Sequence, residues 1–276
     1  MRYGTGGFDA VMAARRDVEV VVLFVHFCIQ LAWGAHLSYG GAHTTPSRPM
    51  TPRDLPPIIC TVDVVLLTLQ AQALHVLLVR RDRAPFARAW ALPGGYIHAQ
   101  DDADAQASAA RVLHDKAGLD SPYLEQLATF SGLARDPRGW SLAVAYCALV
   151  PAHLLAPGAL AAGASLVSVD ALPGLAFDHA EIVHTALARV RSKSQYSSLP
   201  VYLCGDQFTL PQLQAVYEAV LGEPLNKVSF RRKMDEMGML EAVPGAMHSG
   251  GAHRPAQLYR LRQEFRRHLS LSPRGL

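Results

Sequence analysis

The stretch WALPGGYIHAQDDADAQASAARVLHDKAGL, Trp90 to Leu119, decides the fold of this chain. Its opening residues, Leu92-Pro93-Gly94-Gly95, predict a tight turn, and an acidic loop follows. The alanine-rich segment after the loop predicts a helix that ends at Gly118, because glycine is the usual left-handed stop. Carboxylates are favourable at the positive end of a helix. Three acids stand where the first helical turn would begin: Asp101, Asp102 and Asp104.

The same stretch resembles the Nudix box, G-x5-E-x7-R-E-U-x-E-E-x-G-U, in which U is an aliphatic residue. Gly95 takes the place of the opening glycine. The other matches lie in the helix: Arg111, Leu113, Gly118 and Leu119. Gly95 and Arg111 lie two residues further apart than the pattern allows, so the loop is longer. The resemblance implies the α/β class, with a mixed sheet between helices, and the alternation of strand and helix patterns agrees.

The glutamates of the box helix are replaced by Val112, Asp115 and Lys116. Their spacing puts the three side chains on one helical face, which in active Nudix enzymes holds magnesium against a diphosphate. Magnesium prefers hard oxygen ligands, and a like charge beside a divalent ion costs on the order of several kcal/mol. We therefore expect crippled metal-dependent hydrolysis, with no catalytic residue, no metal ligand and no required cofactor.

The loop acids leave an alternative open. We expect Asp101, Asp102 and Asp104 to be solvated capping acids, although these three carboxylates could also rebuild a magnesium site outside the pattern. Arg111 is predicted to be an ion-pair partner of a loop acid rather than a ligand contact.

Basic residues and glycines around the box predict a site for an anionic ligand, because the planar guanidinium group suits phosphate. Arginines at strand ends, Arg138 among them, can also be merely solvated, and the glycine pair can serve a turn alone. Lys116 would supply the charge of the missing metal. The predicted ligand-binding residues are Arg80, Arg81, Gly94, Gly95, Lys116 and Arg135.

The composition indicates one or two globular domains and a reducing compartment. Half of the 276 residues are apolar, enough for a sizeable core. A net charge of +3 does not by itself indicate a nucleic-acid binder. The four cysteines form no CxxC pair, which argues against a disulfide framework or a zinc site and for inert, mostly buried thiols in the cytoplasm.

Residues 1–56 form an N-terminal extension. The apolar run Val18 to Leu37 follows arginines, as in a signal peptide or a marginal membrane helix, but polar residues interrupt it. Ser38 to Pro57 has the composition of a disordered linker. We expect a disordered extension, or translation that begins at Met50, rather than a membrane anchor.

The middle of the chain, 57–200, is predicted to be a Nudix-like ligand-sensing domain. β-rich runs predict a hairpin, Thr61 to Leu69 with Leu74 to Val79, and further strands at Leu127 to Phe130 and Leu142 to Val150. Leu154 to Ala164 has no assigned structure. Asp178 and Glu181 predict a capping box for a helix over His179 to Arg191.

The last part, 201–276, predicts a winged helix-turn-helix domain. Thr209 caps a helix that runs to Gly222, a second helix starts near Ser229, and Met239 to Val243 with Gln257 to Leu261 form a two-stranded wing. Basic residues gather on the second helix and the wing, although they could be a solvated face of a protein-contact module. The predicted DNA-binding residues are Lys227, Ser229, Arg231, Arg232, Lys233, His253 and Arg254.

A degenerate Nudix box followed by a winged helix resembles the Nudix-related transcriptional regulators, whose NrtR branch senses ADP-ribose and represses NAD-biosynthesis genes. The stretches FTLPQLQAVYEAVLGEPLNKVSFRRKM and GGAHRPAQLYRL carry the same resemblance. It implies a cytoplasmic homodimer with two partners, a pseudo-palindromic double-stranded operator and an ADP-ribose-like effector, and no membrane.

Two other classes stay open. The chain could be a Nudix hydrolase that cleaves ADP-ribose or another nucleoside diphosphate derivative with magnesium, the winged helix being an accessory. It could also be an interaction module that does not bind DNA.

Overall fold

The computed structural model describes residues 57–118, 121, 123–155, 160–248, 255–265 and 269–271. The predicted N-terminal extension, 1–56, lies outside these residues, together with its alternatives of an anchor or a start at Met50. The described residues from Pro57 onward belong to one compact unit. None of the helices in this described part is long and apolar enough to cross a membrane.

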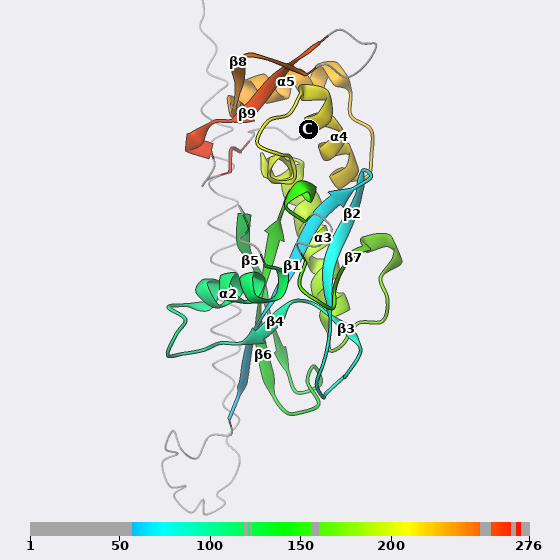
Figure 1. Ribbon diagram of the computed structural model, residues 1–276, viewed down its shortest axis with the longest axis vertical. Helices are drawn as coiled ribbons and strands as arrows, with labels where there is room; N and C mark the ends of the chain where they lie inside the picture. The colour runs from blue at the N-terminus through cyan, green and yellow to red at the C-terminus, as the bar shows by residue number, and fades with distance from the viewer. Residues whose placement is uncertain are drawn as a thin grey trace, which may run out of the picture. The chain divides into compact units, whose positions relative to one another are not determined.

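A mixed sheet of seven strands lies at the centre of the first part of the unit (Figure 1). The strand order is β3-β2-β1-β6-β5, with β4 paired to β1 and β7 to β2. Only β1 and β6 run parallel among these pairs, from Ile59 opposite Ser141 to Leu67 opposite Leu149. The strands are β1 (Ile59–Gln70), β2 (Ala73–Arg80), β3 (Trp90–Ala91), β4 (Gly94–Tyr96), β5 (Tyr123–Gly132), β6 (Ser141–Leu149) and β7 (Ala164–Ser168).

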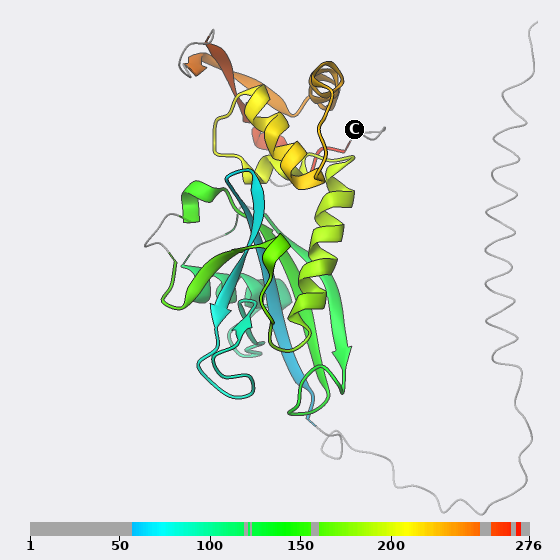
Figure 2. The same ribbon diagram turned by 90° about the vertical axis from the view of Figure 1, so that its right-hand side faces the viewer.

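Helices α2 (Ala105–Ala117) and α3 (His179–Ser194) cover opposite faces of this sheet (Figure 2). Successive side chains of a strand point to opposite faces, and β1 follows this rule. Val65 packs in one buried cluster with residues of α3, whereas Val64 packs in the other with residues of α2. The predicted α/β class, a mixed sheet between helices, is confirmed.

The predicted hairpin is confirmed, because β1 and β2 pair antiparallel from Gln70 opposite Ala73. Ala71 and Gln72 in its turn have φ values of 47° and 62°. The two further strands are also present: β5 is longer than the predicted Leu127 to Phe130, and β6 lies one residue before the predicted Leu142 to Val150. Strand β7 was missed, because all five of its residues are half-buried and give no alternating pattern.

The predicted Leu92 to Gly95 turn is wrong, since Gly94 and Gly95 belong to β4 and pair with Asp63 and Val62 of β1. A side chain on Gly94 would collide with Asp63 Oδ1 and lie 3.0 Å from the Val62 carbonyl oxygen. Close approach of the two strands therefore requires glycine at this position.

The caps of the two helices differ. Asp104 caps α2 by accepting a 2.7 Å hydrogen bond from Ala107 N, and Gly118 ends it at φ 73°, as predicted. Asp178 stands at the N-cap of α3 but makes no side-chain cap bond. The predicted capping box is wrong there because the Asp178 carboxylate instead accepts two bonds from Arg135.

The C-terminal part forms a winged helix, as predicted. It consists of α4 (Leu210–Leu221), α5 (Lys227–Met237), and a wing of β8 (Leu240–His248) and β9 (Ala256–Leu261). Thr209 and Gln212 form the capping box of α4. Asn226 caps α5 through Val228 N and Ser229 N, so this helix begins before the predicted start near Ser229.

The end of α3 and the winged helix are held together by buried contacts. The hydroxyl of Tyr217, a fully buried residue of α4, donates a 2.9 Å hydrogen bond to Ser197 O just beyond α3. Ser198 N donates to Ser270 O at 2.9 Å. Helix α3 therefore connects the sheet physically with α4.

The prediction of mostly buried thiols holds for two of the three cysteines that the structure describes. Cys147 and Cys204 are buried, and burial raises the pKa of each thiol to about 12. Cys60 is exposed, and Cys28 lies outside the described residues.

Candidate functional site

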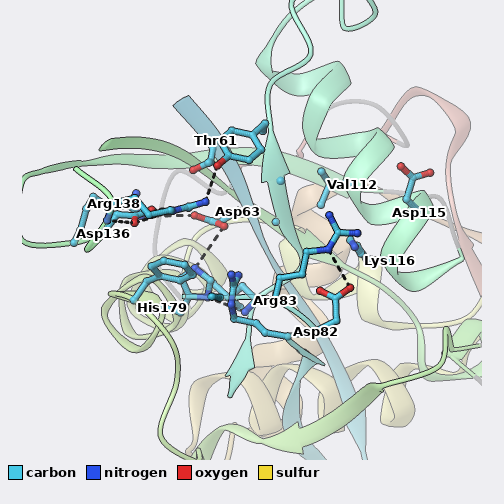
Figure 3. A pocket seen from close by; sticks show the side chains of 18 of the residues that line it. Thr61, Asp63, Asp82, Arg83, Val112, Asp115, Lys116, Asp136, Arg138 and His179 are labelled. Atoms are coloured by element: carbon cyan, nitrogen blue, oxygen red, sulfur yellow. Dashed lines mark hydrogen bonds and ion pairs between the residues drawn. The ribbon is translucent and has the colours of Figure 1, made fainter. Parts of the chain in front are cut away.

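A cavity of about 480 Å³ opens between the sheet and α2 (Figure 3). Its walls come from β1, β4, α2, the loop after β2, the β5–β6 connection and the start of α3. Four carboxylates line it: Asp63, Asp82, Asp115 and Asp136. Six cationic side chains line it: Arg81, Arg83, Arg111, Lys116, Arg135 and Arg138. The excess of positive charge favours an anionic ligand.

Asp63 and His179 face each other in the cavity (Figure 3). His179 Nδ1 accepts a 2.9 Å hydrogen bond from Leu92 N, so in the neutral ring the proton is on Nε2. That nitrogen lies 3.6 Å from Asp63 Oδ1. Burial lowers the pKa of His179 and raises the pKa of Asp63. Both shifts have the same cause, since burial disfavours the charged form of each side chain.

Arg135 lines the cavity from the β5–β6 connection, and its side chain is only 8% exposed. Its Nε and Nη2 donate to the two carboxylate oxygens of Asp178, both at 2.8 Å. Its Nη2 also lies 3.7 Å from Asp63 Oδ2. The Arg135 guanidinium is therefore held in place, paired with the N-cap carboxylate of α3.

Aromatic rings and arginines stack at the cavity wall. The Arg81 guanidinium lies 4.7 Å from the centre of the Phe177 ring. Arg138 lies 5.6 Å from the centre of the Tyr96 ring and donates a 2.6 Å hydrogen bond to the Tyr96 hydroxyl. Asp136 holds Arg138 through Nε and Nη2. This wall offers flat surfaces for a planar group and cations for phosphate oxygens.

The helix face predicted to have lost its metal ligands lies in this cavity. Val112, Asp115 and Lys116 all line it from α2 (Figure 3). The face offers one carboxylate beside an aliphatic side chain and an ammonium group, a donor set that does not fit magnesium. The described part of the chain holds no group of three or more His, Cys, Asp or Glu side chains that could hold a metal ion.

The loop acids lie outside the lining of the cavity. Asp104 caps α2, and Asp101 is 76% exposed. The expectation of a solvated acid is wrong for Asp102, whose side chain is 3% exposed. Asp102 accepts two 2.7 Å bonds from Arg111, a third bond from Ser108 and a fourth from His98 N. The Arg111 bonds hold the pKa of Asp102 far below its usual range, and the predicted role of Arg111 as an ion-pair partner is confirmed.

Most of the predicted ligand-binding residues are brought together. The cavity is lined by Arg81, Gly94, Gly95, Lys116 and Arg135. Arg80 is not among the lining residues. Its guanidinium lies 4.3 Å from the centre of the Trp90 ring and donates to Arg88 O, because Arg80 and Arg81 are adjacent and point to opposite sides. We therefore drop Arg80 from the site.

Sequence reasoning missed the cavity residues Asp63, Tyr96, Phe177 and His179. Asp63 and His179 come from β1 and α3, far apart in the chain, and no local pattern joins them. One signal was present, since Asp63 interrupts the apolar strand TVDVVLLTL and a buried carboxylate needs partners.

The predicted DNA-binding residues of α5 fall into two groups. Lys227, Ser229, Arg231 and Arg232 are exposed. Lys233 is only 7% exposed, beside the buried Phe230, Met234 and Met237. Because its position belongs to the buried face of the helix, we drop Lys233 from the DNA-contact set. His253 and Arg254 lie outside the described residues.

Comparisons with known proteins identify both the Nudix-like part and the winged helix of the chain. The NUDIX domain family model matches residues 60–186, and the model of the NrtR DNA-binding winged helix domain matches residues 200–261. The ADPR responsive transcriptional repressor NtrR of Acinetobacter baylyi is 40% identical over 210 residues, which cover 75% of this chain and 83% of that protein.

Shewanella oneidensis NrtR, solved in complex with a 27mer DNA, is 35% identical with a TM-score of 0.71. The match covers 79% of this chain and 99% of that chain. An ADP-ribose pyrophosphatase of Methanocaldococcus jannaschii is 31% identical over 108 residues, 39% of this chain and 63% of that protein. The two family models and the extent of the matches to the Acinetobacter baylyi and Shewanella oneidensis proteins show that the chain belongs to the NrtR-like family of Nudix-related transcriptional regulators.

Proposed function

We propose that this protein is a DNA-binding transcriptional repressor that leaves its operator when ADP-ribose, or a related nucleotide, occupies the cavity. The observation that carries the proposal is the combination of a cationic cavity with a helix face that has lost its metal ligands. A site of this kind favours binding a diphosphate over cutting it. Two relatives support the same function. The Acinetobacter baylyi protein is named as an ADPR responsive repressor, and the Shewanella oneidensis protein was solved in complex with DNA.

The cavity binds the diphosphate without a metal and requires no cofactor. Lys116 stands at a position where active Nudix enzymes carry a magnesium-binding glutamate, and Arg81 and Arg138 line the same cavity. Arginine and lysine form charge-assisted hydrogen bonds with phosphate oxygens. The Tyr96 and Phe177 rings provide apolar surface for the rest of the nucleotide.

The winged helix binds double-stranded DNA through the exposed face of α5. A single short helix reads few base pairs, so a homodimer on a pseudo-palindromic operator is the arrangement we propose. The regulated genes are those of NAD metabolism, and the protein acts in the cytoplasm.

Helix α3 links ligand to DNA. An anion that engages Arg135 competes with Asp178 at the first turn of α3, and the far end of α3 is tied to α4 through Ser197 and Tyr217. If the DNA-competent arrangement binds the ligand less well, the ligand shifts the population off DNA.

The test begins with DNA duplexes selected from a random pool by the full-length protein, with affinity measured by fluorescence anisotropy at fixed salt. We expect one sequence family to emerge and Arg231→Ala with Arg232→Ala to weaken its binding at least about tenfold. Arg191→Ala, an exposed change on α3, should leave binding intact. Equal affinity for selected and random duplexes would contradict the DNA-binding proposal.

A second candidate function is hydrolysis of ADP-ribose, favoured by the likeness to the Methanocaldococcus jannaschii pyrophosphatase. Its assay is the release of AMP from ADP-ribose with magnesium or manganese. On our proposal no AMP forms above the background of protein-free buffer. AMP release that increases with the metal concentration would favour the hydrolase function over the repressor function.

A further inference from the structure

Helix α5 presents one exposed face and one buried face. Phe230, Met234 and Met237 pack into the winged-helix core. Val228, Arg231 and Arg232 are exposed. Their spacing of three and four residues places them on the same side of the helix.

Val228 is 76% exposed, and it is the one apolar side chain on the exposed face of α5, every residue of which is described. Single exposed apolar side chains are ordinary on protein surfaces. The position of this one is informative, because it lies in the first turn of the second helix of a helix-turn-helix. In that motif the N-terminal residues of the second helix contact base edges in the major groove.

The first turn of α5 is held rigidly. The Asn226 side chain accepts 3.0 Å hydrogen bonds from both Val228 N and Ser229 N. A β-branched side chain also has few rotamers in a helix. The cap and the branching at Cβ therefore restrict the two methyl groups of Val228, on the helix face that also carries Arg231.

Thymine alone among the four DNA bases carries a methyl group at the major-groove edge, and apolar side chains recognise it by contact. We propose that Val228 reads a thymine methyl group and so determines specificity at one base pair of each half-site. The proposal rests on the DNA binding proposed above. Arginines on the same face supply phosphate or guanine contacts that an aliphatic side chain cannot make.

The experiment uses the full-length protein and the duplex selected from a random pool. Each thymine is replaced singly by deoxyuridine, which removes only the 5-methyl group and keeps every hydrogen-bonding atom. We expect one replacement per half-site to weaken wild-type binding about fourfold, the loss for one buried methyl group. The other replacements should have little effect.

Val228→Ala makes the test specific. This variant should bind the thymine and deoxyuridine duplexes equally, because the contact is already lost, and since Val228 is exposed its fold should be unchanged by circular dichroism. Leu133→Ala, at a residue 71% exposed outside the winged helix, should keep the fourfold preference for thymine.

Two outcomes overturn the inference. If every deoxyuridine replacement affects wild type and Val228→Ala alike, DNA is bound but Val228 does not read the methyl group. If the selection yields no preferred sequence, the DNA-binding proposal fails and this inference fails with it.

Discussion

At the scale of single residues, Gly94 shows how a backbone requirement shapes the site. Strand β4 lies so close to Asp63 that a side chain on Gly94 would collide with the carboxylate, whereas one on Gly95 would meet only Val112 Cγ2 at 3.3 Å. Gly94→Ala should therefore cost about 2 kcal/mol of unfolding free energy, and Gly95→Ala less than about 1 kcal/mol. Urea denaturation of both variants checks this, and equal losses would contradict it.

Asp102 gives a prediction about pH. Arg111 holds the folded pKa of Asp102 below its unfolded value, so the stabilisation is complete above the unfolded pKa and is lost as pH falls through the folded pKa. Asp102→Asn should destabilise the protein at pH 7, and the difference from wild type should shrink towards pH 2. Urea midpoints measured across this range test the expectation.

Asp101→Asn is the matched control for that series. Its side chain is 76% exposed, with His98 Nδ1 3.9 Å away. Its stability should follow the wild-type curve at every pH. An Asp102→Asn curve parallel to wild type would show that the ion pair does not contribute.

Residue roles were predictable where the signal is local. Gly118 and Thr209 end and begin helices as expected, because a cap depends on neighbours within a few residues. Asp178 failed that rule because Arg135, distant in sequence, binds its carboxylate. The buried position of Lys233 follows from the packing of α5 on the winged-helix core, which basic-residue clustering does not reveal.

At the scale of elements, α2 carries Lys116, which we propose takes the place of a metal ion beside the diphosphate. Lys116→Glu should lower the affinity for ADP-ribose in EDTA by about tenfold or more, because reversing a charge about 4 Å from a phosphate changes the interaction by about 2 kcal/mol even at the dielectric constant of water. Isothermal titration calorimetry measures it. Arg191→Glu on α3 makes an equal charge change away from the cavity and should leave the affinity unaltered. Unchanged binding by Lys116→Glu would refute the role of this lysine.

Elements with strong periodicity or flanking turn signals were predictable from sequence, among them the β1–β2 hairpin and α4. Strand β7 was not, since it is recognised only through its pairing with β2. The cavity itself needs β1, β4, α2 and α3 together, and their juxtaposition depends on sheet order rather than on any one segment.

At the scale of the whole molecule, the contact between α3 and α4 is the proposed route from ligand to DNA. Tyr217→Phe removes the bond to Ser197 O and should cost about 1 kcal/mol of stability. It should also reduce the effect of ADP-ribose on DNA affinity, whose usual size is about 5–150-fold. Anisotropy titrations with and without ligand give both affinities, and Tyr196→Phe, at a residue 41% exposed near the end of α3, is the control. A full ligand effect in Tyr217→Phe would exclude this route.

The measurement that tests the central claim most directly is an ADP-ribose titration of the protein bound to its selected duplex, followed by anisotropy at fixed salt in EDTA. Salt is fixed because phosphate contacts make DNA affinity steeply salt-dependent. We predict that ADP-ribose releases the DNA without any divalent metal and is recovered uncut. DNA that stays bound at saturating ADP-ribose, or release that requires magnesium and yields AMP, would contradict the account.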